Sequence, residues 1–195
     1  MNKTLLAAAL CASFSAVAQT PRNAIKLNTI SLVLKTASLF YEHQLTDSRS
    51  LNLGLLVANY SPPPSDVELA GRGFALTGEY RFYRGSHALR GWFAGPYVRF
   101  QRYDFTNTNT LHFGGVTTII VDKSRLTTFG GGGVVGWKGQ LGPRFCLEPF
   151  LGIGYAAGQV DDLDDDKGSL EIGGGIRGLE VRPGLSVGYL FGAAK

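Results

Sequence analysis

Eight segments of this chain share one pattern, in which an apolar residue alternates with a small or polar one over about ten residues. Because successive side chains of a β-strand point to opposite faces, a period of two separates two surfaces of a sheet. An amphipathic helix repeats about every 3.6 residues and does not produce this pattern. The chain is therefore predicted to be all-β, with eight strands at 24–34, 37–45, 50–60, 73–83, 91–103, 126–141, 145–156 and 171–191.

The connections between these segments alternate between short and long. The short ones, at 46–49, 84–90 and 142–144, contain turn-forming residues such as Asp47, Gly85 and the Gly142-Pro143 pair. The long ones lie at 61–72, 104–125 and 157–170, and on that side only the first connection, at 35–36, is predicted to be tight. Short turns on one side and long loops on the other are typical of a bacterial outer-membrane barrel. This asymmetry predicts an eight-stranded antiparallel up-and-down transmembrane β-barrel.

The two faces of the predicted strands differ in polarity. One face carries large apolar residues, among them Leu51, Leu53, Leu55, Val57, Leu76, Phe82, Trp92, Val98 and Phe100. The other is dominated by small residues with a few charges, which suits the filling of a narrow barrel better than a water-facing exterior. A soluble lipocalin-like barrel, with its apolar face inward, has the same alternation and is the competing interpretation. The low charged fraction of 17% and the 27 glycines favour the membrane barrel.

Charged residues recur on the inward face and nearly balance one another. An eight-stranded barrel is just wide enough to be filled by its own side chains. We therefore predict a structural polar network in the lumen and no continuous pore, with Glu42, Glu79, Arg81, Arg99, Glu148 and Arg182 as its members and Glu180 on the same face.

The amino terminus has the features of a cleaved secretory signal. Lys3 precedes an apolar stretch that ends at the small residues Ala16-Val17-Ala18. We expect residues 1–19 to be the signal peptide and 20–195 to form the barrel domain, located in the bacterial outer membrane. Removal of the signal removes Cys11, so Cys146 has no partner for an internal disulfide.

Several short motifs carry a family resemblance. They are Asn23-Ala24-Ile25-Lys26-Leu27-Asn28, Tyr41-Glu42, Gly95-Pro96-Tyr97, Glu148-Pro149 and Arg182-Pro183. Together they resemble a family of small outer-membrane β-barrels common in the Bacteroidota, a domain of unknown function. In architecture the chain also looks like the eight-stranded OmpA and OmpX barrels. The resemblance implies a fold and a location but no activity.

Two kinds of motif raise the question of a cofactor or metal. Gly131–Gly136 and Gly173–Gly178 both fit GxGxxG, but no helix is predicted to follow either one and hold a phosphate. Asp162, Asp164 and Asp166 have the spacing of a calcium loop, but Lys167 stands where that loop needs glycine. We predict no cofactor and no metal, with a solvated acidic loop as the default and weak Ca²⁺ or Mg²⁺ binding as the alternative.

The sequence does not indicate an enzyme. None of His43, His87 and His112 is followed two residues later by serine, the His-x-Ser pattern of outer-membrane lipid A deacylases and phospholipases. The formal net charge of +4 is too small and dispersed to indicate nucleic-acid binding.

The predicted function is structural or interactive. The partners we expect are outer-membrane lipid and lipopolysaccharide, with a surface protein or polysaccharide at the outer loops. The loop at 104–125 has a suitable composition, since Tyr103, Phe105, His112 and Phe113 lie near Asn107 and Asn109. A narrow channel or transporter is the alternative, and a lipid-modifying enzyme is a third candidate.

Overall fold

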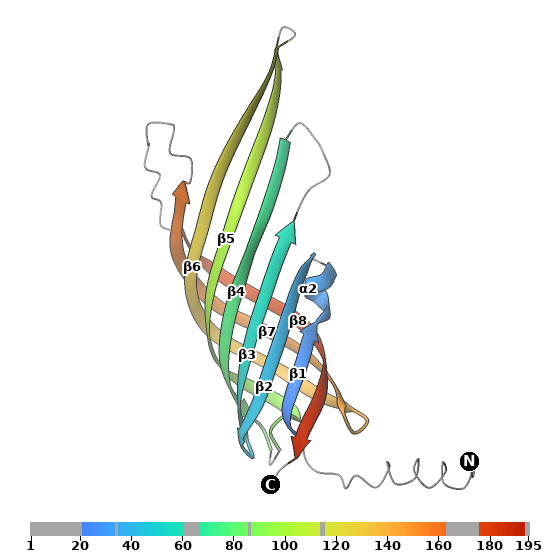
Figure 1. The fold of residues 1–195 in the computed structure, drawn as a ribbon. Helices are drawn as coiled ribbons and strands as arrows, with labels where there is room; N and C mark the ends of the chain where they lie inside the picture. The colour runs from blue at the N-terminus through green and yellow to red at the C-terminus, as the bar shows by residue number, and fades with distance from the viewer. Residues whose placement is uncertain are drawn as a thin grey trace, which may run out of the picture.

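The structure is a computed structural model that describes residues 21–33, 35–60, 67–85, 87–113, 116–162 and 176–193. Its strands form one closed barrel in which each pairs antiparallel with the next and β8 pairs with β1 (Figure 1). The predicted eight-stranded antiparallel barrel is therefore confirmed. The predicted signal peptide lies outside the described residues. The strands are β1 (Pro21–Asn28), β2 (Thr36–Thr46), β3 (Arg49–Tyr60), β4 (Val67–Tyr83), β5 (Gly91–Phe113), β6 (Val116–Leu141), β7 (Phe145–Asp162) and β8 (Ile176–Ala193).

The strands at one end of the barrel are longer than predicted. β5 and β6 remain paired as far as Phe113 and Val116, so the predicted loop at 104–125 is wrong and is replaced by a β-hairpin (Figure 1). β4 begins at Val67 and β7 ends at Asp162, so the predicted loops at 61–72 and 157–170 are also shorter. The hairpin contains many threonines and β-branched apolar residues, which favour strands even where an apolar-polar alternation is missing.

The first predicted strand, at 24–34, is wrong in its second half. β1 ends at Asn28 and the chain turns into a short helix, α2 (Thr29–Val33), at the end of that strand (Figure 1). The Asn28 side chain accepts a hydrogen bond from the Ile30 N–H at 3.2 Å, an N-terminal cap that competes with strand geometry. Lys35 then adopts a positive φ of 54° before β2. The predicted tight connection at 35–36 is therefore wrong as well.

Helix α2 lies where β1 has ended, between β8 and β2. The β1–β8 pairing stops at Asn28 and Ser186, and the β1–β2 pairing stops at Leu27 and Leu39. Beyond that level the Thr29 hydroxyl donates to the carbonyl of Leu185 at 2.8 Å. On the other side, the Thr36 hydroxyl donates to the Ser31 carbonyl at 2.9 Å. Side chains of α2 and its flanks thus replace the missing strand pairing.

The outer surface of the barrel is apolar and its inner surface holds the polar side chains. Trp92 is 61% exposed and Leu179 is 74% exposed, whereas Lys26 and Glu42 are completely buried. Six aromatic residues near the short turns are exposed on the outer surface: Phe82, Trp92, Trp137, Phe145, Tyr189 and Phe191. Inside, an aromatic cluster formed by Phe40, Tyr83, Phe93, Tyr97 and Phe150 packs with Ala88 and Val134.

Glycines allow neighbouring strands to approach closely at β6. A Cβ added at Gly132 would stand 2.2 Å from the carbonyl oxygen of Ile153, whereas one at Gly133 would meet no atom within 4 Å. Gly131–Gly136 lie inside β6, which continues to Leu141 and ends in a turn. The first GxGxxG match is therefore part of a β-strand in the barrel wall. The second lies mostly outside the described residues, as does the acidic loop.

Candidate functional site: a charged network in the lumen

The barrel interior contains a network of seven charged side chains that come from six strands. They are Lys26 on β1, Glu42 on β2, Glu79 and Arg81 on β4, Lys138 on β6, Glu148 on β7 and Arg182 on β8. Each occupies the inward phase of its strand, and none is more than 8% exposed. The closed sheet therefore brings together charges that are up to 156 positions apart in the sequence, the separation of Lys26 and Arg182.

Glu42 lies at the centre of this network. One carboxylate oxygen accepts from Lys26 Nζ at 2.6 Å and from Arg81 Nη1 at 3.1 Å, and Lys138 Nζ also contacts it. The other oxygen accepts hydrogen bonds from the Ser50 and Tyr83 hydroxyls, each at 2.6 Å. A buried carboxylate needs partners of this kind, because its removal from water is costly unless charge and hydrogen bonds compensate.

Glu148, on β7, contacts the same three cations. Its oxygens lie 2.9 Å from Lys26 Nζ, 2.9 Å from Arg81 Nη1 and 3.0 Å from Lys138 Nζ. Three cations thus bridge two carboxylates. None of these cations can move away without breaking ion pairs to both carboxylates.

Glu79 extends the network toward the hairpin end of the barrel. One of its oxygens accepts two charge-assisted hydrogen bonds from Arg81, from Nε at 2.8 Å and from Nη2 at 2.5 Å. Asn52 Nδ2 donates to the same oxygen at 3.0 Å. The second oxygen lies 3.2 Å from Arg182 Nη2.

Aromatic rings cover the cations of the network. The Arg81 guanidinium lies 4.2 Å from the Phe93 ring centre, and that of Arg182 lies 4.6 Å from the Tyr97 ring centre. Such cation–π contacts favour a guanidinium from which water has been removed. The aromatic cluster and the charged network therefore fill the lumen together.

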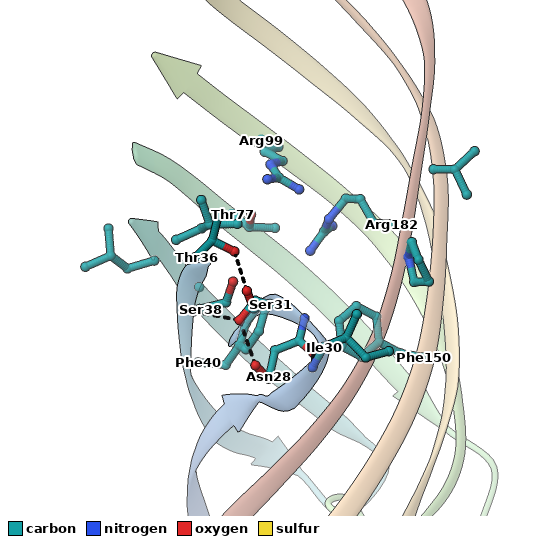
Figure 2. A pocket seen from close by; sticks show the side chains of 15 residues that line it. Asn28, Ile30, Ser31, Thr36, Ser38, Phe40, Thr77, Arg99, Phe150 and Arg182 are labelled. Carbon is teal, nitrogen blue, oxygen red and sulfur yellow. Dashed lines mark hydrogen bonds between the residues drawn. The ribbon is translucent and has the colours of Figure 1, made fainter. Parts of the chain in front are cut away.

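A separate ion pair lies closer to the hairpin end of the barrel than the network does. Arg99 Nη1 is 3.1 Å from Glu180, and both side chains are nearly buried. The Tyr97 hydroxyl donates to Glu180 at 3.4 Å. Arg99 and Arg182 both line a cavity, which Figure 2 shows.

The structure brings five of the six residues proposed from sequence into one network: Glu42, Glu79, Arg81, Glu148 and Arg182. Arg99 instead pairs with Glu180. The sequence reasoning missed Lys26 and Lys138. The alternation along the strands predicts that both point inward. Lys26 lies two residues after the buried Ala24, and Lys138 directly follows the outward-facing Trp137.

Each carboxylate of the network contacts at least one cation. The exposed residues His43 and His87 lie outside the network, and the His112 side chain is not described. Within the described ranges, no three His, Cys, Asp or Glu side chains form a potential metal site. In the same ranges, no helix is long and apolar enough to cross a membrane. The ion pairs of the network link six of the eight strands.

These features define a class of protein: a small closed β-barrel with an apolar exterior and a charged interior. The chain belongs to the family described as a protein of unknown function (DUF3575), which matches residues 4–171. The expectation of a family of unknown function is thus confirmed.

The solved structures that are similar to the chain include the two that follow, and no curated protein matches it. The crystal structure of Acinetobacter baumannii CarO has 12% identity, with 88% of this chain and 97% of that chain covered at a TM-score of 0.43. The N-terminal β-barrel domain of Pseudomonas aeruginosa OprF has 17% identity, with 89% and 98% covered at a TM-score of 0.34.

Proposed function

We propose that the protein is an integral outer-membrane β-barrel that serves as a stable platform for contacts at the cell surface. The observation that carries this proposal is the reversed polarity of the barrel. Leu53, Phe129 and Leu179 are at least half exposed on the outside, whereas Glu42 and Lys138 are completely buried inside. A continuous apolar band of this size is unusual on a soluble monomer and suits a hydrocarbon environment.

The strand arrangement supports one orientation in that membrane. Pro21 at the start of β1 pairs with Ala193 at the end of β8, so both ends of the barrel sequence lie on the side of the short turns. Bacterial barrels of even strand number keep this side in the periplasm. The β5–β6 hairpin then projects from the cell surface (Figure 1).

The base of the hairpin offers a contact surface for lipopolysaccharide. Arg72, Arg102 and Arg125 lie on the outward phase of three neighbouring strands, with Asp104 between Arg72 and Arg125 in the register. Asp104 is 2.6 Å from Arg125 and offsets one positive charge. The remaining positive charge, just beyond the apolar band, suits the phosphates of an outer leaflet.

The hairpin itself offers a surface for a protein or polysaccharide. Tyr103 and Phe105 stack at the base of its β5 strand with ring centres 6.2 Å apart. Aromatic rings next to amide side chains, such as that of Asn107, are suited to carbohydrate and protein contacts. This role needs no pore, and the ion pairs of Glu42, Arg81 and Glu148 span the lumen.

The proposal is tested by treating intact cells with a protease while the envelope is also fractionated. We expect the protein in the outer-membrane fraction, cleavage within 104–125 on intact cells, and no conductance in planar bilayers. A matched control is cleavage at the short turn 142–144, which should require broken cells. Recovery from the soluble periplasm would contradict the membrane location, and reproducible conductance would favour the narrow channel.

A further inference from the structure

A cavity lies in the barrel lumen between helix α2 and the charged network. Its volume is about 180 Å³, far above the roughly 10–15 Å³ that one water requires. Figure 2 shows its walls: α2 and β2 contribute small polar groups such as Ser31 and Ser38, while Phe40 and Phe150 contribute apolar surface. Cavities with mostly apolar walls and a few convergent polar groups are the usual form of a small-molecule site.

Two arginines point into this cavity with unused hydrogen-bonding capacity (Figure 2). Arg182 is 8% exposed, and its Nη2 lies 3.2 Å from Glu79, but its buried Nη1 has no hydrogen-bond partner among the described residues. Arg99 uses Nη1 for Glu180, and its buried Nε likewise lacks a partner in the described structure. A buried donor without a partner is costly, and two beside one cavity point to an acceptor that binds there.

The charge balance of the lumen points to the sign of that acceptor. The described lumenal side chains include five cations and four carboxylates, which leaves an excess of one positive charge. The cations are Lys26, Arg81, Arg99, Lys138 and Arg182, and the carboxylates are Glu42, Glu79, Glu148 and Glu180. In a low-dielectric interior an uncompensated charge is unfavourable. One monoanion at the cavity would neutralise the set.

We propose that this cavity binds the carboxylate group of a ligand between Arg99 and Arg182. The planar guanidinium fork matches a carboxylate in shape and charge, which favours this group over a spherical anion. The apolar walls at Phe40 and Phe150 would hold the body of the ligand. The outward-facing residues Leu55 and Val181 also line the cavity. The cavity therefore reaches the barrel wall beside α2. This site is separate from the surface contacts proposed above and does not depend on them.

The site is tested with the mature chain in lipid nanodiscs and butyrate labelled with ¹³C at its carboxyl group. Saturable broadening of the ¹³C signal is expected with butyrate, and butylammonium should not compete. Decanoate, which partitions into the bilayer, is then added as a competitor. Displacement supports a carboxylate amphiphile as the ligand, whereas binding of butyrate without displacement supports a water-soluble carboxylate. The proposal is overturned if butyrate shows no saturable signal or if butylammonium competes equally.

Charge variants distinguish a binding role from a merely structural one. We expect Arg99→Gln and Arg182→Gln each to weaken butyrate binding by about tenfold, because each removes a charged donor. Glu180→Gln should instead tighten binding, because it frees the Arg99 guanidinium from its ion pair with the Glu180 carboxylate. Arg177→Gln, an exposed charge on β8, is the matched control and should bind as the parent does. A Glu180→Gln protein that folds but binds butyrate more weakly than the parent would overturn the assignment.

Discussion

Replacing Glu42 by glutamine removes one negative charge from the centre of the lumenal network while keeping the size of the side chain. The parent network has four cations and three carboxylates, so the variant leaves four cations facing two carboxylates. Breaking a buried ion pair by removing one partner destabilises a protein by about 3–5 kcal/mol. Glu42 contacts three cations and is completely buried, so we expect the upper half of that range.

The assay is unfolding by guanidinium chloride in lipid vesicles, followed by tryptophan emission. Trp92 and Trp137 are both exposed on the outer surface and report the loss of lipid contact. Asp122→Asn, which neutralises an exposed carboxylate on β6, is the matched control and should change the free energy of unfolding by less than about 0.5 kcal/mol.

A second substitution tests the electrostatic explanation itself. Lys138→Met removes a cation that contacts Glu42, so combining it with Glu42→Gln restores the original excess of one positive charge. We expect the double variant to lose less stability than the sum of the single variants, with a coupling energy of about 1–3 kcal/mol. Unfolding of Glu42→Gln at the same guanidinium chloride concentration as the parent would refute the reasoning. It is also refuted if the losses of unfolding free energy in the two single variants are strictly additive in the double variant.

Three further predictions concern other parts of the barrel. Gly132→Ala should impair folding into vesicles on a heat-modifiability gel, because its Cβ would overlap neighbouring backbone, whereas Gly133→Ala should fold normally. The hydrogen bond from Arg125 lowers the pKa of Asp104 below its usual value of 3.8, so this pair stabilises the hairpin at neutral pH and is lost as the pH falls through the lowered pKa. The protection factors of the hairpin amides, which correct for the intrinsic pH dependence of exchange, should fall in that acidic range, and Asp104→Asn should show the lower protection at all pH values. Cys146 is buried, so a maleimide reagent should label it only after unfolding, and rapid labelling of the folded barrel would contradict its placement.

Period-two alternation was sufficient to predict the fold, because each strand must separate an apolar outer face from a polar lumen over the same span. It also located Glu42, Glu79 and Arg81, since a charge opposite large apolar neighbours has to point inward. The same rule applied to every strand would have included Lys26 and Lys138.

The hairpin and the helix were not predictable by this rule, for physical reasons. The segment 104–125 lacks the apolar–polar alternation of the other strands, although its described residues belong to β5 and β6. At Asn28 a side-chain cap to the Ile30 N–H ends β1, and the apolar residues of α2 then imitate a continuing strand. Partners such as Arg99 and Glu180 depend on register, which the sequence pattern does not determine across a closed barrel.

The central claim is that the apolar face of each strand contacts lipid while the charged face is packed inside. Spin labels placed singly along β3, from Leu51 to Leu56 in a Cys146→Ser background, test it most directly. We expect oxygen accessibility in bilayers to be high at Leu51, Leu53 and Leu55 and low at the alternate positions, with little access to a water-soluble nickel complex at the lipid-facing sites. High nickel accessibility at Leu51, Leu53 and Leu55 would contradict the membrane-facing assignment.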